Sequence, residues 1–343
     1  MTFSRKFLLA VWLLGTLCFL GADPAAARKP KPKFAIKFAT LAPEGSAWMQ
    51  AMHEIDDEVR ARTENRLGFK FYPGGVQGDE KDVLRKIRMG QLHGGGFTGF
   101  GIGAIASDVR VLEMPFMFRD HAELDFVRDA LAIELNGMLA HKGYLNLGWV
   151  DVGFTYIFSK NPIANLDDLS KARMWIWAGD PLAEVFFQAF GISPIPLAAP
   201  DVLTSLQTGV IDAAYNSPLG CLALQWFTRV DYMTEVPISH GLGTVLINEK
   251  ALRKVSAEDR AVLQEVAGPI LRDLTEKTRT QNREAIAEMR KEGVQVVPVD
   301  DAVKARFFAT GRDAWGNGVD QLYSAELLRK VQDLLDRYRA GNP

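Results

Sequence analysis

The sequence predicts an α/β protein built from two lobes, and three observations support this prediction. Strand and helix patterns alternate along the first part of the chain, as in α/β folds. A helix–glycine–strand segment occurs twice. The chain has 343 residues, 48% of them apolar and 24% charged, which is enough for two hydrophobic cores. A net charge of only −2 argues against a nucleic-acid partner.

The N-terminus has the pattern of a secretory signal peptide. Arg5 and Lys6 precede an uncharged run over residues 7–22, and three alanines end at Ala27. The run is shorter than the roughly 20 residues that span a bilayer, which disfavours a membrane anchor. We therefore expect residues 1–27 to be a signal peptide, cleaved after Ala27, and the mature protein to be periplasmic.

The two cysteines fit this export route. Cys18 lies inside the predicted signal peptide, and bulky Leu17 before it disfavours lipoprotein processing. Cys221 is then the only cysteine of the mature chain. No internal disulfide is expected, so a large core must hold the fold.

The first strands and helices are expected in alternation. Phe34, Ile36 and Phe38 alternate as in a strand, and apolar residues at helical spacing over 48–59 predict a helix. A second strand is expected over 69–72. Asp79 is suited to cap a helix that ends at Gly90. This β-α-β-α order predicts a mainly parallel sheet.

Similar patterns continue in the second half. Strands are expected over 147–158, 173–177 and 211–215, and helices over 181–190 and 201–208. Residues 256–292 predict a long helical rod, interrupted at Pro269, that braces both lobes. The alternative is two ordinary helices that meet at Pro269. The tail over 301–339 is expected to form helices that pack against the lobes.

The repeated segment suggests that both lobes share one structural unit. DVLRKIRMGQL begins at Asp82 and DVLTSLQTGVI at Asp201, an offset of 119 residues. Applied further along the chain, this offset places residues 94–99 opposite residues 213–218. Two equivalent loops are therefore expected to face each other, unless the match is a chance similarity of two capped helices.

Gly94, Gly96 and Gly99 have the spacing of a dinucleotide-binding loop. Such a loop requires a strand immediately before the glycines and a helix opening on them, whereas these glycines follow a helix. We therefore expect no nucleotide and no other cofactor. The glycines are instead expected to form the low wall of a cleft beyond the strand ends.

The sequence shows no evident arrangement of catalytic or metal-binding residues. His53 and Glu54 begin like the helix of a zinc protease, but Asp57 stands where the second histidine belongs. Structural or solvated roles are expected for the remaining histidines: His93, His121, His141 and His240. We therefore expect a protein that is not an enzyme and holds no metal.

Aromatic side chains gather around the strand ends predicted for the second half. They are Phe154, Tyr156, Trp175, Trp177, Tyr215 and Trp226. Trp175 and Trp177 share one face of their strand. Rings in such a place can line a pocket for an apolar or cationic group, at ~25 cal/mol per Å² of buried area. They can equally form ordinary core, and both interpretations stay open.

Three segments resemble the solute-binding proteins of TRAP (tripartite ATP-independent periplasmic) transporters: FYPGGVQGDEKDVLRKIRMGQL, VLEMPFMF and PDVLTSLQTGVIDAAYNSP. The similarity runs from about Lys33 through the last helices. It implies a two-lobed, type II-like periplasmic binding protein fold, with a long helix bracing both lobes and crossings near Val152 and Ser239. Lobe I would comprise residues 28–152 plus 240–278, and lobe II residues 153–239 plus 279–343. The implied partners are a small and a large membrane permease subunit, with uptake driven by an ion gradient.

The resemblance includes a departure at the expected ligand site. Trp175 stands where the family has a carboxylate-binding arginine, and Phe154 and Tyr156 lie where a second arginine is often found. Arg173 is an alternative partner for a carboxylate, although it would lie about 7 Å along the strand. Members with this tryptophan resemble a branch that has tetratricopeptide partners, which implies apolar ligands.

We therefore expect a receptor that closes over a small apolar or amphipathic organic solute. Thr98, Asp180 and Asn216, which matches a family asparagine, are expected to orient the solute. The alternatives are an organic acid bound through Arg173 or another cation, a periplasmic enzyme on the same scaffold, and an adaptor for a protein partner. Contact area is expected from six aromatic residues: Phe97, Phe154, Tyr156, Trp175, Trp177 and Tyr215.

Overall fold

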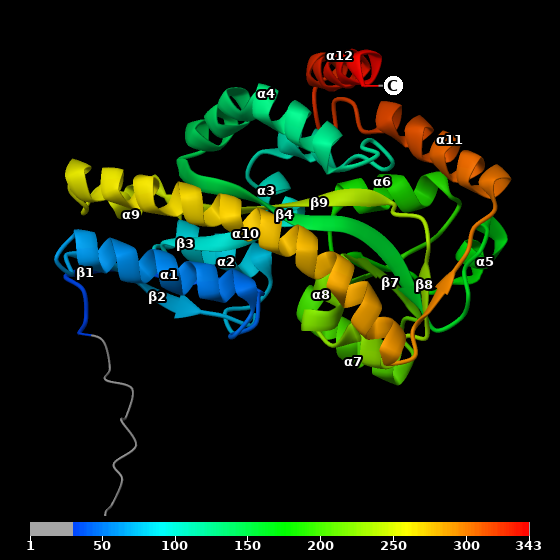
Figure 1. Ribbon diagram of the computed structural model, residues 1–343, viewed down its shortest axis with the longest axis horizontal. Helices are drawn as coiled ribbons and strands as arrows, with labels where there is room; N and C mark the ends of the chain where they lie inside the picture. The colour runs from blue at the N-terminus through cyan, green and yellow to red at the C-terminus, as the bar shows by residue number, and fades with distance from the viewer. Residues whose placement is uncertain (1–29, 343) are drawn as a thin grey trace, which may run out of the picture. The chain divides into compact units, whose positions relative to one another are not determined.

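The computed structural model describes residues 30–342. The signal peptide predicted for residues 1–27 lies outside the described residues. Residues 32–342 belong to one unit of mixed strands and helices (Figure 1).

This unit contains β-strands, α-helices and short 3₁₀ helices. The strands are β1 (Phe34–Ala39), β2 (Leu67–Tyr72), β3 (Gly94–Thr98), β4 (Tyr144–Ser159), β5 (Trp175–Trp177), β6 (Ile195–Leu197), β7 (Ala213–Asn216), β8 (Tyr232–Thr234), β9 (Ser239–Asn248) and β10 (Gln295–Val297). The α-helices are α1 (Ala47–Arg62), α2 (Glu80–Arg88), α3 (Gly99–Gly103), α4 (His121–His141), α5 (Leu166–Lys171), α6 (Pro181–Ala189), α7 (Val202–Thr208), α8 (Pro218–Ala223), α9 (Glu249–Leu252), α10 (Ala257–Lys291), α11 (Asp301–Asn317) and α12 (Ala325–Gly341). The 3₁₀ helices are η1 (Ser107–Glu113), η2 (Ala199–Asp201) and η3 (Trp226–Arg229).

The main sheet is mixed, so the prediction of a mainly parallel sheet is wrong. Its order is β10-β8-β4-β9-β3-β1-β2, and β7 also pairs with β4. β1 is parallel to β2 and β3, as the β-α-β-α order requires, but β9 runs antiparallel to both β3 and β4. The two long strands β4 and β9 therefore lie side by side at the centre of the sheet and join its two ends.

The repeated unit is present in both halves. α2 is followed by Gly90 and β3, and α7 is followed by Gly209 and β7. Both glycines adopt a left-handed conformation, with φ of 74° and 75°. This conformation ends a helix without the steric cost that a side chain would bring. The offset of 119 residues holds beyond the glycines, because β3 begins at Gly94 and β7 at Ala213.

α10 is one continuous helix of 35 residues, and the predicted interruption at Pro269 does not occur. Pro269 lies on the exposed face of the helix, where the carbonyl left without its amide partner can reach water. The helix contacts α1, β4 and α8 along its length (Figure 1). It therefore packs against elements from both halves of the chain, as expected for a bracing helix.

The hydrophobic residues form separate clusters on either side of the central strands. One cluster joins α1, β1 and β2 to α10, and another joins η1, α4 and α12. Two more clusters fill the second half around β5, α6, α7 and β7. The predicted lobe boundaries remain a proposal; α12, at the end of the chain, packs against α4 of the first half, whereas α11 contacts α6.

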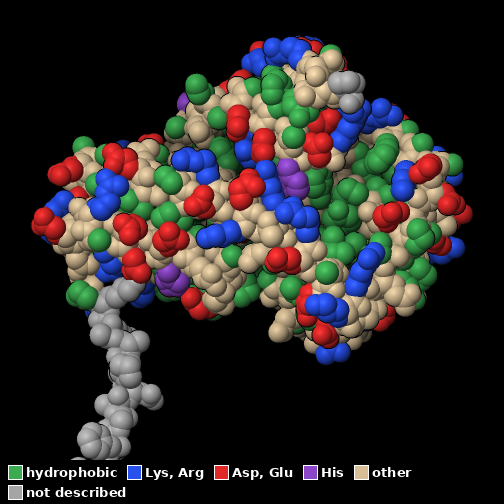
Figure 2. Space-filling model, viewed as in Figure 1, with side chains coloured by type: hydrophobic (Ala, Val, Ile, Leu, Met, Phe, Trp, Pro, Cys, Tyr) green, Lys and Arg blue, Asp and Glu red, His purple; other side chains and the backbone are tan. Residues whose placement is uncertain are grey.

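Charged side chains are interspersed on the face shown in Figure 2, where acidic and basic groups alternate rather than gather by sign. A mixed surface of this kind produces no strong single-sign field to steer a charged molecule toward this face.

Candidate ligand-binding site

A cavity of about 490 Å³ lies between the two copies of the repeated unit. The first copy contributes the end of β3 and the start of α3, including Gly96, Phe97 and Thr98. The second copy contributes Tyr215 and Asn216 from the end of β7, with the start of α8. Both of the equivalent loops predicted from the repeat therefore contribute residues to the cavity lining.

Trp175 lines the cavity, but most of its ring is packed into the second half of the chain. The residue is only 1% exposed, and its indole N–H donates to the carbonyl of Leu197 at 3.0 Å. Its ring stacks on Tyr215, with centroids 5.1 Å apart, and meets the edge of Trp226 at 5.3 Å. The pocket and core interpretations therefore both apply, because the same packed cluster of aromatic rings belongs to the hydrophobic core and forms part of the cavity wall.

Trp177 joins the two halves across the cavity. Its indole N–H donates to Asp79 Oδ2 at 2.8 Å, and Asp79 also accepts from the backbone N–H of Ala199 at 3.3 Å. The Trp177 ring stacks on Phe100 at 4.9 Å. Burial raises the pKa of the Asp79 carboxyl, while these hydrogen bonds oppose the rise. Trp177 thus lines the cavity and also holds the halves together.

Arg110 is a charged residue of the cavity wall that sequence analysis missed. It lies on η1, is 6% exposed, and donates both terminal nitrogens to the Asp180 carboxylate at 2.9 and 3.1 Å. Its Nε lies 2.7 Å from Glu113 Oε2. Burial lowers the pKa of Arg110, but Asp180 and Glu113 outweigh this and raise it. The guanidinium is therefore charged and already paired.

Asp180 was expected to orient a solute, and it does line the cavity. Its carboxylate is, however, engaged by Arg110 and by the backbone N–H of Leu182 at the start of α6. The signal that could have revealed Arg110 is its place between Val109 and Val111, with Glu113 three residues later. A charged residue inside such an apolar run predicts a buried ion pair.

Glu80 fills the position that a phosphate would need at the glycine-rich loop. Its carboxyl oxygens accept from the backbone N–H groups of Thr98 at 2.8 Å and Gly101 at 2.7 Å. Burial raises the pKa of Glu80 to about 8. A Cβ added at Gly99 or Gly101 would collide with Glu113 or Glu80, so these glycines make room for carboxylates of the protein itself.

Two of the glycines expected in a low cleft wall have a different role. Gly94 and Gly95 lie inside the sheet, where a Cβ would meet the carbonyl of Leu246 or of Ala39. Only Gly96 of this triplet borders the cavity. The expectation of a wall over residues 94–96 is therefore wrong for its first two members, because β3 is a central strand and not a loop.

Phe154, Tyr156 and Arg173 are outside the cavity lining formed by the described residues. Phe154 packs against two histidines, and Tyr156 pairs with Asn216 across β4 and β7. The Arg173 side chain is 54% exposed and bonds Asp212 at 3.0 Å. Arg173 does not lie on the strand that was expected over 173–177, because β5 begins only at Trp175. Arg110, and not Arg173, is thus the cation of the cavity wall.

Two of the polar residues expected to orient a solute, Thr98 and Asn216, line the cavity but are engaged within the protein, whereas Trp48 Nε1 and Gln281 Oε1 of the wall are buried without a hydrogen-bond partner in the described part of the chain. Thr98 contacts Glu80 through its backbone N–H and through its hydroxyl, at 2.8 and 3.2 Å. Asn216 Oδ1 accepts from the backbone N–H of Ser217 at 2.8 Å. The wall therefore presents mainly rings and aliphatic side chains, including Phe97, Phe186 and Leu219.

A cavity between two lobes, joined by crossing strands and one long helix, defines the two-lobed solute-binding fold. Over residues 38–322 the chain matches the family of bacterial extracellular solute-binding proteins, family 7, and it belongs to this family. The resemblance to the solute-binding proteins of TRAP transporters is thereby confirmed.

Individual relatives are distant in sequence but similar in fold. The 2,3-diketo-L-gulonate-binding periplasmic protein of Escherichia coli (strain K12) is 25% identical over 299 residues, covering 83% of this chain and 87% of the relative. The sugar acid binding protein of Advenella mimigardefordensis, solved with galactonate, has a TM-score of 0.83 at 18% identity and covers 90% of this chain and 99% of its own. A TRAP periplasmic solute-binding protein from Xanthobacter autotrophicus Py2, solved with bound β-D-galacturonate, has a TM-score of 0.81 at 20% identity. The match covers 88% of this chain and 99% of that protein.

This family consists of receptors that bind small solutes outside the cytoplasm and work with membrane permeases, and not of enzymes. Among residues 30–342, no helix has the length and apolar character needed to cross a membrane.

Proposed function

We propose that this chain is the periplasmic receptor of a TRAP-type transporter and closes over a small amphipathic or apolar solute. It would deliver the solute to a small and a large permease subunit, and a tetratricopeptide protein is a further proposed partner. The observation that carries the choice of solute is that Arg110, the cation of the cavity wall, is already paired with two carboxylates.

A solute carboxylate would have to compete for this guanidinium. Asp180 occupies both terminal nitrogens of Arg110, and Glu113 lies against the remaining one. Displacing Asp180 would leave its buried carboxylate without a cationic partner, a change that typically costs about 3–5 kcal/mol. The total binding free energy of a micromolar ligand is only about 8 kcal/mol. A small, highly charged acid is therefore disfavoured.

The walls suit a molecule with an apolar body. A volume of about 490 Å³ is typical for a cavity that encloses a small organic molecule. The Trp175, Phe186 and Phe187 rings and the Leu182 side chain offer contact area. The unpartnered Trp48 Nε1 and Gln281 Oε1 of the wall offer polar points, and an amphipathic solute would direct its polar group toward them.

The alternative solute is an organic acid held through Arg110. Binding of galactonate and galacturonate by two proteins of similar fold favours this alternative. It requires Arg110 to exchange Asp180 for the solute when the cavity is filled.

Native mass spectrometry of freshly purified protein tests the proposal. We expect a co-purified or extract-derived molecule that is mostly apolar and carries at most one charge. A small polyhydroxy acid bound one to one would contradict the proposal and support the alternative. Trp175→Phe is the variant to compare, because it keeps a packed ring but removes part of the apolar area that faces the cavity. The dissociation constant of an apolar solute should therefore rise.

A further inference from the structure

Two histidines and one aspartate that are far apart in the sequence converge beside the central strands. His121 is the first residue of α4, Asp151 lies on β4 and His240 lies on β9. One ligand atom from each lies within 4.8 Å of the other two. Among the described residues this is the one group of three histidine, cysteine or acidic side chains with such a spacing.

His240 is buried without the hydrogen bonds that a buried imidazole normally makes. It is 1% exposed, and neither ring nitrogen has a hydrogen-bond partner within the described part of the chain. Asp151 Oδ2 lies 3.6 Å from His240 Nε2, which is too long for a hydrogen bond. Buried polar side chains are almost always satisfied, so an unmet imidazole points to a missing partner.

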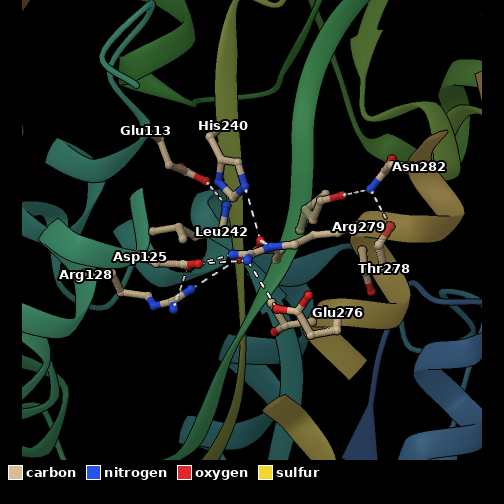
Figure 3. Close-up of polar contacts among 12 residues, drawn as sticks. Glu113, Asp125, Arg128, His240, Leu242, Glu276, Thr278, Arg279 and Asn282 are labelled. Atoms are coloured by element: carbon tan, nitrogen blue, oxygen red, sulfur yellow. Dashed lines mark hydrogen bonds and ion pairs between the residues drawn. The ribbon is translucent and has the colours of Figure 1, made fainter. Parts of the chain in front are cut away.

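Charged groups from α4, α10 and η1 surround the three residues. Arg279 on α10 contacts Asp151 at 2.5 Å and Asp125 at 2.6 Å, and Arg128 on α4 lies 2.8 Å from Asp125 and 3.4 Å from Asp151. Figure 3 shows Asp125, Arg128 and Glu276 gathered around the Arg279 guanidinium, with the His240 ring above them.

The net charge around the three residues does not exclude a cation. The two arginines oppose a cation, but they are neutralised by Asp125, Asp129 and Glu276 in addition to Asp151. On η1, Glu113 also faces this region, where it accepts from the backbone N–H of Leu242, but it is paired with Arg110. The remaining four carboxylates still outnumber the guanidiniums of Arg128 and Arg279.

We propose that His121, Asp151 and His240 form a binding site for a divalent transition-metal ion of the zinc class. Imidazole nitrogens with one carboxylate oxygen favour such ions over Mg²⁺ or Ca²⁺. Two ligands about 2.1 Å from a tetrahedral ion lie roughly 3.4 Å apart, close to the 3.6 Å between His240 and Asp151. His121 is only partly buried, so its ring can rotate inward and its exposed side leaves a path for the ion.

The position of this site gives it a structural consequence. Asp151 and His240 flank the points where the chain is expected to cross between lobes, near Val152 and Ser239. The register of β4 against β9 shifts between Asp151 and Gly153, and Gly153 has a φ of 112°. A bound ion would tie both crossing strands to α4 at this irregularity. The proposal does not depend on which solute fills the cavity.

The test is calorimetric titration of Zn²⁺ into the exported protein, purified without a histidine tag and treated with a chelator. We expect saturable one-to-one binding that excess Mg²⁺ does not displace. Co²⁺ should give a visible absorption spectrum typical of nitrogen and oxygen ligands. His121→Ala should weaken Zn²⁺ binding by at least about tenfold, since even residues that only support a ligand cost this much.

His53→Ala is the matched control, because His53 is partly exposed and pairs with Glu44 at 2.8 Å outside this site. It should bind Zn²⁺ as the wild type does. His240→Gln should also lose binding, provided that circular dichroism shows a folded protein. If His240→Gln does not fold, the His121→Ala variant decides the outcome, because His121 is only partly buried. Absence of one-to-one binding, or equal binding by wild type and His121→Ala, would overturn the proposal.

Discussion

At the residue scale, the Arg110 guanidinium is held by two buried carboxylates and should be important for stability. Arg110→Met leaves Asp180 and Glu113 buried without their cation, and we expect it to lower the free energy of unfolding by about 3–5 kcal/mol. Chemical denaturation measures this loss. Adding Asp180→Asn to Arg110→Met should restore part of it, because the second change removes one unpaired charge. A loss below about 1 kcal/mol in the single variant would show that the carboxylates are better solvated than their burial implies.

Glu80 should make the protein less stable as the pH rises. The pKa of the Glu80 carboxyl is about 8 in the folded protein, whereas an ordinary glutamate has a pKa of 4.5. The folded state therefore holds the proton more tightly than the unfolded chain does. Its contribution to stability is therefore complete below about pH 4.5 and is lost as the pH rises toward 8. Chemical denaturation across this pH range should show that the free energy of unfolding falls less steeply with pH in Glu80→Gln than in wild type. Glu58→Gln, at an exposed position of α1, should decline as wild type does.

At the element scale, the two copies of the repeated unit make matched predictions. Gly90 and Gly209 have nearly the same positive φ, and a Cβ at either position would meet no atom within 4 Å. Alanine at either site should therefore cost about 1–2 kcal/mol from backbone conformation alone. Asparagine should cost less, since it tolerates the left-handed region better. Thermal or chemical unfolding of the four variants tests this, and clearly unequal costs at the two sites would argue against equivalent roles.

Pro269 inside α10 should reduce the stability of that helix. Pro269→Ala restores a backbone hydrogen bond at an exposed position, where proline is about 3 kcal/mol less favourable than alanine. Part of the gain is offset because alanine gives the unfolded chain more freedom. We expect a net increase of about 1–2 kcal/mol in the free energy of unfolding. A decrease would indicate that the helix depends on the shape that Pro269 imposes.

Local patterns predicted individual elements better than their assembly. The spacing of Phe34 to Val59, the cap at Asp79 and the glycine at Gly90 all describe short-range structure, and the structure agrees. The pairing of β3 with β9 joins residues about 150 positions apart, and no local signal reports it. The long α10 was expected with an interruption because the exposure of Pro269 is a tertiary property.

The same limit explains which parts of the candidate site were missed. The aromatic residues at the strand ends could be found because they are dense along the chain, and Phe97, Trp175, Trp177 and Tyr215 do line the cavity. Arg110 is a single charge in an apolar run, whose partner Asp180 lies 70 residues away. His121 and His240 looked scattered because only the fold of α4 and β9 brings their rings within 5.6 Å.

At the scale of the whole molecule, several polar contacts join the two halves around the cavity. Trp177 donates to Asp79 at 2.8 Å, Lys81 donates to the carbonyl of Gly179 at 2.9 Å, and Arg110 binds Asp180. Each contact joins residues about 70–100 positions apart in the chain. These contacts should contribute to the free-energy difference between a closed and an open arrangement of the lobes.

Trp177→Phe should shift this balance toward the open arrangement. The substitution keeps a ring against Phe100 but removes the hydrogen bond to Asp79. Small-angle scattering of the solute-free protein should show a larger radius of gyration than wild type. Trp149→Phe is the control, because the Trp149 indole N–H bonds Asn136 within the first half of the chain. Equal radii for Trp177→Phe and wild type would show that this hydrogen bond does not hold the lobes closed.

The central claim is that the guanidinium of the cavity is neutralised from within, so that the receptor does not select a solute by its carboxylate. Calorimetry on one matched pair, an amphipathic carboxylic acid and its primary amide with the same carbon skeleton, tests the claim most directly. We expect the two dissociation constants to agree within about tenfold. A site built to bind the carboxylate would instead prefer the acid by ~10⁴-fold or more, because its polar groups would lose their partner in the amide complex. Such a preference, abolished in a folded Arg110→Lys variant, would contradict the account.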